Sequence, residues 1–152
     1  MKFKVLVSTL VLAAVTVTAA SIARANTTVA GGACQAYQGS NESFVIHSFL
    51  GCVTLGTTST VSVVFPEVRI NQPTAQSLYV DTTGSTTASL LCNAYLYPYN
   101  GGPSTWSDTR TVTCNAFNEM SFSVPADAWG YLTVYCNLPP NCRIMGTGLS
   151  PG

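Results

Sequence analysis

The chain has 152 residues, of which 8% are charged, with six Lys and Arg against six Asp and Glu. Three of the basic residues lie before residue 26, so the remainder has three arginines against six acids, a net charge of 3 − 6 = −3. A region without lysine and with only three separated arginines lacks the clustered positive charge that binds a phosphate backbone, so we expect no nucleic-acid partner.

The first 25 residues have the order of a secretory signal peptide. Lys2 and Lys4 give a positive start, residues 5–20 are mostly apolar, and Ala23-Arg24-Ala25 is a small-x-small cleavage motif. The apolar run is shorter than the ~20 residues of a membrane span, and no later segment reaches that length without a polar break. We therefore expect a signal peptide over 1–25 and one mature domain over 26–152. We expect this domain to be secreted, periplasmic or extracellular, with no membrane span.

Period-two alternation of apolar residues marks a series of short candidate strands after the leader. In chain order, the predicted strands cover residues 44–50, 61–65, 78–80, 88–96, 112–114, 120–124, 132–136 and a last short strand around Ile144. Pro66, Pro125 and Pro139-Pro140 are expected to end three of them, and residues 101–104 form the clearest loop. No segment has a helical stripe. The pattern predicts an all-β fold, an antiparallel two-sheet sandwich that is jelly-roll or immunoglobulin-like.

An even number of cysteines in an exported chain predicts a disulfide-stapled domain. Cys92 alternates in phase with Leu90 and Leu96, and Cys136 in phase with Leu132 and Val134, so both cysteines should point inward and favour a Cys92–Cys136 bond. Cys34–Cys52 and Cys114–Cys142 then follow by elimination and by what is local. Six cysteines allow 15 pairings, so a small Cys136–Cys142 loop stays open as the main rival.

Motifs for catalysis are missing from the sequence. His47, the one histidine, alternates out of phase with Phe44 and Ile46, which predicts a surface side chain, and nothing places an acid beside it. There is no Cys-x-x-Cys pair, Gly-x-Ser-x-Gly elbow, His-Glu-x-x-His or phosphate-binding glycine loop, so we expect no metal and no cofactor. The acids are scattered; Asp108 and Asp127 are typical of turns and Glu67 of a strand end. Two carboxylates would suffice for a glycosidase, which keeps a small hydrolase open.

Aromatic residues are the most informative feature for function. Tyrosines recur at every second position on the face opposite Cys92, a tryptophan follows across the glycine loop, and a second aromatic row lies opposite Leu132 and Cys136. These candidates for a ligand-binding surface are Tyr95, Tyr97, Tyr99 and Trp106, with Trp129, Tyr131 and Tyr135 in the second row. Aromatic rings beside amides and hydroxyls suit sugars, because a ring stacks on the apolar face of a pyranose. The alternatives are ordinary cross-strand pairing, or packing against the second sheet or another subunit.

Three stretches together carry a resemblance. They are Pro66-Glu67-Val68-Arg69, Tyr135-Cys136-Asn137-Leu138-Pro139-Pro140 and the closing strand at Ile144. With Cys34 and the leader, they resemble an uncharacterised family of small exported bacterial β-domain proteins. That family's pattern has a cysteine before the proline, where this chain has Phe65. The resemblance implies a compact exported β-domain and carries no activity and no binding residue.

Three functions follow in order of preference. The first is a non-catalytic exported β-sandwich that binds a glycan or cell-surface material, with Asn100 and Asp108 as polar groups near the rings. The second is a structural or protective surface protein whose aromatic faces make subunit contacts, and the third is a small secreted hydrolase. An aromatic groove, a flat apolar patch or two facing carboxylates would favour the first, second or third, respectively. The ligand and the oligomeric state stay open.

The leader and the cysteine count generate one prediction. The secreted product should begin at Asn26 and contain no free thiol, because the leader is removed and the cysteines pair. Intact mass with and without reduction measures both properties. A mass that retains residues 1–25, or labelling by a thiol reagent without reduction, would contradict the prediction.

Overall fold

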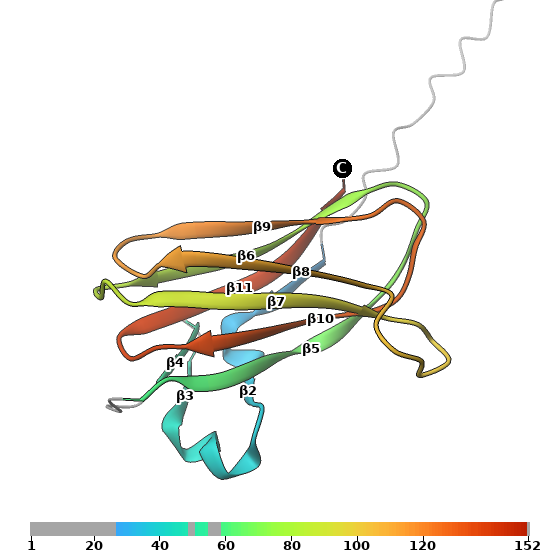
Figure 1. The fold of residues 1–152 in the computed structure, drawn as a ribbon. Coiled ribbons are helices and arrows are strands. Elements are labelled where there is room, and N and C mark those ends of the chain that lie inside the picture. The colour runs from blue at the N-terminus through green and yellow to red at the C-terminus, as the bar shows by residue number, and fades with distance from the viewer. Residues whose placement is uncertain (1–26, 49–50, 55–58, 152) are drawn as a thin grey trace, which may run out of the picture.

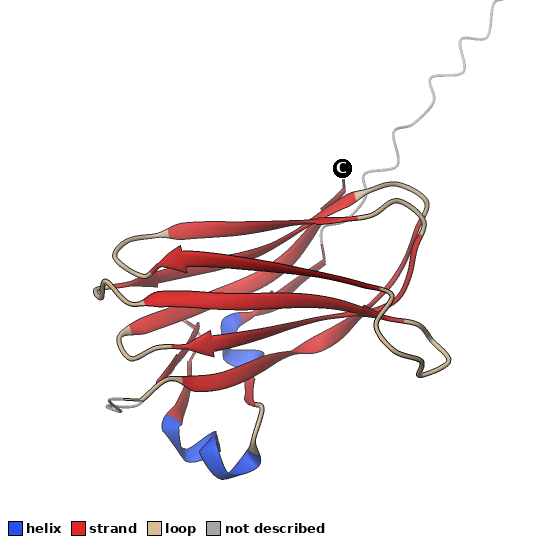
Figure 2. Cartoon of the chain, in the orientation of Figure 1, coloured by secondary structure: helices blue, strands red, loops and turns tan. Residues whose placement is uncertain are grey.

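The computed structural model describes residues 27–48, 51–54 and 59–151, so the predicted signal peptide and its cleavage site lie outside the described residues. Its strands are β1 (Thr27–Ala30), β2 (Gln35–Ala36), β3 (Val45–Ser48), β4 (Gly51–Thr54), β5 (Val61–Gln72), β6 (Gln76–Gly84), β7 (Ser89–Tyr97), β8 (Trp106–Thr113), β9 (Asn118–Val124), β10 (Ala128–Leu138) and β11 (Cys142–Pro151). Two short 3-10 turns, η1 (Gly31–Ala33) and η2 (Gly39–Phe44), lie near the N-terminus (Figure 2).

The strands form two antiparallel sheets that pack face to face (Figure 1). One, sheet A, has the order β3-β4-β11-β6-β9, with β1 also paired to β11; the other, sheet B, has the order β2-β5-β10-β7-β8. The pairs β4–β11, β5–β10, β6–β9 and β7–β8 are nested, as in one long hairpin wrapped into two sheets. This is a jelly roll, and its strand order distinguishes it from the immunoglobulin-like alternative. Among the described residues, no helix has the length and apolar character needed to cross a bilayer.

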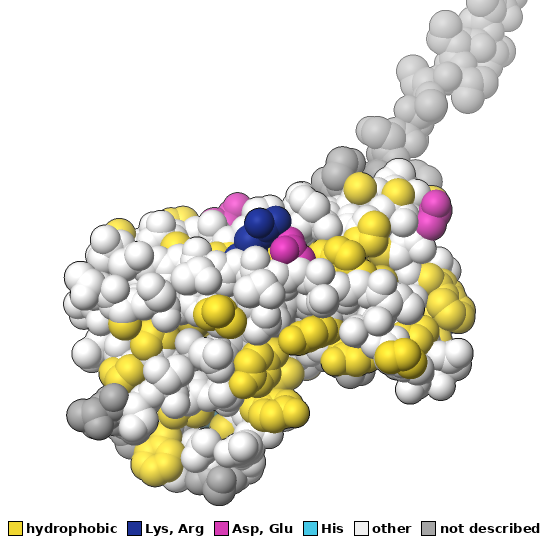
Figure 3. Space-filling view, in the orientation of Figure 1, with side chains coloured by type: hydrophobic (Ala, Val, Ile, Leu, Met, Phe, Trp, Pro, Cys, Tyr) yellow, Lys and Arg dark blue, Asp and Glu magenta, His cyan; other side chains and the backbone are white. Residues whose placement is uncertain are grey.

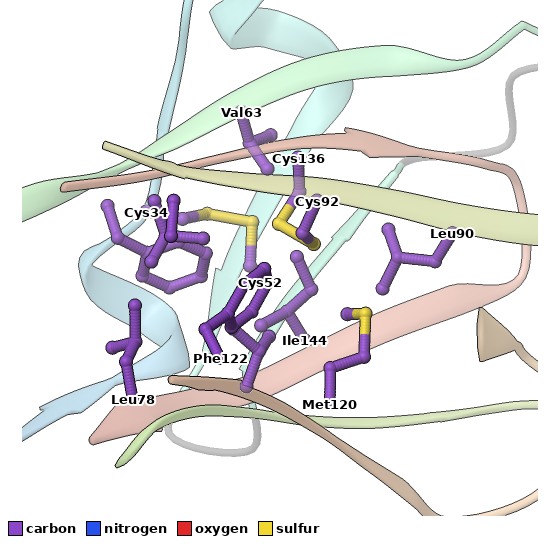
Figure 4. Close-up of a cluster of buried hydrophobic side chains, with 14 of the residues drawn as sticks. Cys34, Cys52, Val63, Leu78, Leu90, Cys92, Met120, Phe122, Cys136 and Ile144 are labelled. Carbon is purple, nitrogen blue, oxygen red and sulfur yellow. A yellow bond between two sulfur atoms is a disulfide. The ribbon is translucent and has the colours of Figure 1, made fainter. Parts of the chain in front are cut away.

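The core forms where the inward faces of the two sheets meet. In β7, β9 and β10 the alternation predicted from the sequence holds, and every second side chain is buried. Phe65, Phe122, Leu90 and Ile144 are among the fully buried side chains, and Figure 4 shows Phe122, Leu90 and Ile144 together in one cluster. Full burial of such a side chain contributes roughly 1.5–3 kcal/mol, so the apolar stripe of each strand determines which way the strand faces.

Three disulfides lie within or beside this core: Cys92–Cys136, the pair that strand phase favoured, and Cys34–Cys52 and Cys114–Cys142, the pairs expected by elimination. Cys92 and Cys136 are direct register partners on β7 and β10, so their bond lies within sheet B. Cys34, just before β2, bonds to β4, and Cys114, just after β8, bonds to the start of β11, so these two bonds connect sheet B to sheet A. Three buried disulfides are typical of a protein that folds in an oxidising compartment.

The first predicted strand has the wrong phase. Phe44 lies in η2 and is 43% exposed, Ile46 is 38% exposed, and Val45 between them is buried at 7%; Leu50 lies outside the described residues. β3 is an edge strand with a single neighbour, β4, and the pairing of Val45 with Thr54 sets its register. Two local apolar residues could not override that pairing, because an edge strand has little core to bury them against.

Pro66 does not end its strand, as the sequence had predicted. β5 continues through it to Gln72, because the register with β10 shifts between Val134–Phe65 and Leu132–Val68. The shift places two residues of β5 opposite one of β10, which is a β-bulge. A proline has no N–H to donate and is tolerated at a bulge, where the ladder is already interrupted. The bulge thus lengthens β5 along the whole of β10.

The central disulfide generates a stability prediction. The Cys92–Cys136 bond closes a loop with a sequence separation of 44, which in the chain-entropy account corresponds to about 4 kcal/mol. Replacing both cysteines by alanine should lower the free energy of unfolding by ~2–4 kcal/mol, measured by denaturant unfolding without reductant. The double variant avoids leaving a free thiol. An unchanged unfolding midpoint would contradict this account of the fold.

Candidate binding site

The outer face of sheet B carries a band of aromatic side chains. Tyr95 and Tyr97 on β7 lie on the opposite side of the strand from Cys92, and Tyr131 and Tyr135 on β10 lie opposite buried Leu132 and Cys136. Register pairing places Tyr97 beside Tyr131, so both strands present their rings on one face. Figure 3 shows hydrophobic side chains gathered over this region, with the visible charges at a distance near the upper edge. The predicted outward phase is therefore confirmed for Tyr95, Tyr97, Tyr131 and Tyr135.

A groove of about 280 Å³ opens on this face, and we call it the tyrosine groove. Its lining consists of Tyr37, Val64, Tyr95, Tyr97, Thr133 and Tyr135. These residues come from β7, β10, β5 and the segment after β2, which are neighbours in sheet B. The groove therefore runs across the strands over about three interstrand spacings, roughly 14 Å. Tyr37 and Val64 were not predicted, because Tyr37 reaches the groove through the pairing of β2 with β5, and Val64 through the pairing of β5 with β10.

The hollow exists because two small side chains lie between large ones. Val64 and Thr133 form its floor, and tyrosines stand around them. The Thr133 hydroxyl donates to the Phe65 carbonyl at 3.0 Å. This buried hydroxyl therefore has a hydrogen-bond partner, and its side chain stays close to the backbone of the sheet. Thr133 pairs in register with Tyr95, and the β5 bulge lies on its other side. The bulge therefore leaves Thr133 without a one-to-one register partner on β5.

Hydrogen bonds and ring packing hold one wall of the groove. The Tyr135 hydroxyl donates to Ser62 Oγ at 2.7 Å, and Ser62 Oγ donates to Asn137 Oδ1 at 3.0 Å. The Tyr37 N–H donates to the Ser62 carbonyl at 2.8 Å, and the Tyr37 ring packs edge-on against Tyr135 with centroids 5.2 Å apart. Ser62 thus connects both rings to β5. On the other wall, Tyr95 and Tyr97 lie with centroids 6.1 Å apart.

A second group of rings, the aromatic corner, adjoins the groove and consists of Tyr99, Trp129 and Tyr131, with Arg69 packed against it. Tyr99 packs edge-on against Trp129 at 4.5 Å and against Tyr131 at 5.0 Å between centroids. Its hydroxyl donates to the Ile70 carbonyl, and the Arg69 guanidinium carbon lies 4.7 Å from the centre of its ring. Tyr99 also raises the pKa of Arg69 above its already high value, so this guanidinium stays charged.

Gly130 is needed for the two aromatic groups to come together. It lies between Trp129 and Tyr131 with φ +152°, and a Cβ there would be 2.0 Å from the Tyr97 carbonyl oxygen. Only glycine permits this backbone and this close approach of β10 to β7. The sequence places a glycine inside an aromatic strand, which is the signal that could have indicated the close approach.

Trp106 was predicted on the tyrosine face, and this was wrong. Trp106 is the register partner of Leu96, a residue on the inward face of β7, and its ring packs against the buried core. Asp108 is likewise not a turn residue: it lies in β8 on the Trp106 side of the strand and pairs with Arg110 at 2.8 Å. Strand phase cannot be carried across a loop, because residues 98–105 do not alternate. Neither side chain can therefore belong to the tyrosine groove.

His47 is exposed, as predicted, but an acid does lie beside it. Its Nε2 is 2.6 Å from Glu42 Oε1, and its Nδ1 is 3.2 Å from the Gly32 carbonyl oxygen. Glu42 also accepts the Ala36 N–H at 2.7 Å, and this bond, together with His47, lowers the pKa of the Glu42 carboxyl. The one sulfur near the ring, Cys34 Sγ at 3.9 Å, is in a disulfide and cannot act as a nucleophile. The contact between Glu42 and His47 thus attaches η2 to β3.

None of the acids whose side chains the structure describes lines the groove. Asp81 and Glu119 are direct register partners on β6 and β9, on the outer face of sheet A, and burial raises the pKa of Asp81. A second hollow of about 280 Å³, lined by Val53, Thr83, Gly84, Ser85, Asn141 and Arg143, is polar and has no aromatic ring. Among the described residues, no group of three or more His, Cys, Asp or Glu side chains is placed to hold a metal ion.

Comparisons with known proteins identify the fold. No protein-family model matches the chain, and no curated protein matches it. Among solved structures, it is similar to the xylan-binding module CBM15, with a TM-score of 0.54 and 12% identity over 84% of this chain and 98% of that one. It is also similar to a family 35 carbohydrate binding module from Clostridium thermocellum, with a TM-score of 0.51 and 11% identity over 84% of this chain and 99% of that one. The fold is thus the β-sandwich of such modules.

The position of Trp106 generates a prediction that reverses the expectation from sequence. Trp106→Ala should lower the free energy of unfolding by roughly 2–4 kcal/mol, because it removes a ring that packs against the core. Denaturant unfolding measures this loss. Exposed Trp129 is the matched control, and Trp129→Ala should cost less. Equal small losses for the two variants would contradict the inward placement of Trp106.

Proposed function

We propose that this protein is a non-catalytic carbohydrate-binding module and that the tyrosine groove holds the glycan. The observation that carries this proposal is the set of four tyrosine rings around one open groove on the outer face of sheet B. Open grooves lined by rigid aromatic rings suit sugar chains, because several pyranose faces can stack while their hydroxyls stay near polar groups. The similarity in fold to two carbohydrate-binding modules supports the same function.

The polar groups of the groove also suit a ligand rich in hydroxyls. Within the described part of the chain, the hydroxyls of Tyr95 and Tyr97 have no hydrogen-bond partner, whereas those of Tyr135 and Thr133 bond to β5. The first pair can therefore bond a ligand, and the second pair keeps the groove in shape. Asn93, paired in register with Tyr135 on the same face, adds an amide beside the rings. Preformed sites lose less entropy on binding, which favours useful affinity from a few weak contacts.

The groove residues favour binding without catalysis. Its lining residues, as far as the structure describes their side chains, include no carboxylate, imidazole or thiol, and glycoside hydrolysis ordinarily requires two carboxyl groups that flank the scissile bond. The adjacent acids Asp81 and Glu119 lie on the other sheet's outer face. A sugar in the groove would therefore meet rings, hydroxyls and an amide, which hold a glycan in place but do not cleave it.

The second candidate function, a surface protein with aromatic subunit contacts, has one observation in its favour. Tyr37 is 64% exposed and Trp129 is 51% exposed, one near each end of the aromatic face. Large exposed rings can also mark a protein–protein contact. Self-association predicts a dimer in size-exclusion chromatography and loss of that dimer when either ring is replaced, whereas glycan binding predicts a monomer that keeps both rings free.

A glycan array with the secreted protein, followed by titration calorimetry on the best neutral oligosaccharide, measures the proposed activity. Tyr97→Ala should weaken binding about 2- to 12-fold, the equivalent of ~0.5–1.5 kcal/mol for one stacked ring. The Tyr95→Ala/Tyr97→Ala double variant should weaken it further. Melting temperatures should change little, because both side chains point away from the core.

Tyr79→Ala is the matched control, since Tyr79 is a half-buried tyrosine on β6 in sheet A, on the other side of the sandwich. Its affinity for the same oligosaccharide should equal that of the unaltered protein. If the double variant binds as tightly as the unaltered protein, the groove is not the site. If no glycan binds and the protein elutes as a dimer, the second function takes its place.

A further inference from the structure

Arg69 lies on the same face as the groove and in line with it. Its register partner on β10 is Tyr131, and Tyr131 is in turn the partner of Tyr97 on β7. These three residues form one row across sheet B. Neighbouring strands are about 4.8 Å apart, so the backbones of Arg69 and Tyr97 are separated by roughly 10 Å. A glycan that stacks on Tyr97 and continues along this row therefore reaches Arg69.

The guanidinium of Arg69 is held in place by the aromatic corner. Its Cζ lies 4.7 Å from the centre of the Tyr99 ring, within the range of a cation–π interaction. Tyr99 is fixed in turn by its hydroxyl bond to the Ile70 carbonyl and by edge-on packing against Trp129 and Tyr131. A guanidinium that lies over a ring keeps its in-plane N–H donors, and these match the two oxygens of a carboxylate.

Among the acidic side chains that the structure describes, which leave out that of Glu67, none forms an ion pair with this guanidinium. The two ion pairs found there join His47 to Glu42 and Arg110 to Asp108. Arg110 is thus a paired arginine on the edge strand β8, whereas Arg69 is an exposed arginine that contacts rings. In a protein with so few charges, a guanidinium that contacts a ring on the aromatic face attracts an anion.

We propose that Arg69 and the aromatic corner form a second subsite, continuous with the tyrosine groove, that binds the carboxylate of a uronic-acid unit. This inference rests on the proposed function, because the neighbouring sugars occupy the groove. The rings stack on the sugar, and Arg69 makes a bidentate, charge-assisted bond to its carboxylate. The preferred ligands are then acidic polysaccharides and not their neutral counterparts.

The test compares each acid with the same molecule without its charge. Trigalacturonate, triglucuronate and trimannuronate are titrated into the secreted protein, each alongside its fully methyl-esterified form. At least one acid should bind about tenfold more tightly than its ester, and this preference should shrink as salt is added, because salt screens an exposed charge pair. Arg69→Gln should abolish the preference, because it weakens binding of the acid far more than binding of the ester.

Arg110→Gln is the control, because it removes the same charge at an arginine that is already paired. It should keep the preference for the acid. If acid and ester bind equally and both depend on Tyr97, the groove binds glycans and the carboxylate subsite is wrong. A preference for the acid that survives Arg69→Gln also overturns it. If no acid, ester or neutral oligosaccharide binds, the proposed function fails and this inference fails with it.

Discussion

The alignment of β7 with β10 is the constraint on which the rest of the molecule depends. Cys92 and Cys136 are opposite each other in this pair and are bonded, which leaves one register available to the two strands. Side chains alternate across a strand, so a slip by one residue would exchange every inward side chain for an outward one. With the register fixed, the apolar residues of both strands enter the core and their tyrosines share the opposite face. The disulfide in the core therefore helps to determine which side chains lie on the outer face, although it makes no contact with that face.

The jelly-roll wrapping places this pair at the centre of sheet B, and the groove follows from that position. β10 has β7 on one side and β5 on the other, and β2 extends the sheet beyond β5. Each neighbour contributes to the same face: tyrosines from β7, a floor residue and an arginine from β5, and Tyr37 from the segment after β2. The bulge in β5 at Pro66 leaves Thr133 without a one-to-one register partner on that side. A small side chain in a gap among large rings makes a hollow, so the groove is a product of packing across four strands.

The sequence was informative where a strand alternates over several residues between two neighbours. The predicted phase was right for residues 88–96, 120–124 and 132–136. The inward cysteines and the outward rings of Tyr95, Tyr97 and Tyr131 follow from that phase. The sequence failed where tertiary pairing overrides local pattern. β3 took its register from β4, so Val45 and not Ile46 was buried. Trp106 followed its partner Leu96 inward, because phase is lost through the preceding loop. Val64, Tyr37 and Arg69 joined the site through pairings of residues distant in sequence, which no periodicity reveals.

The aromatic residues on the two faces of sheet B have different roles. Inward rings such as Phe65 and Trp106 meet the core, and their loss would cost stability. Outward rings do not collapse into the core, because the rigid sheet holds their backbones and because they pack edge-on against one another, as Tyr99 does with Trp129 and Tyr131. Edge-on pairs of this kind are worth about 0.5–1.5 kcal/mol each, enough to set a ring's orientation but little beside the core. The outer rings are thus ordered before any ligand arrives, at small cost to the fold. Residues of the outer face can accordingly be replaced at little cost to the fold, because the cysteines and the inward stripe hold the scaffold.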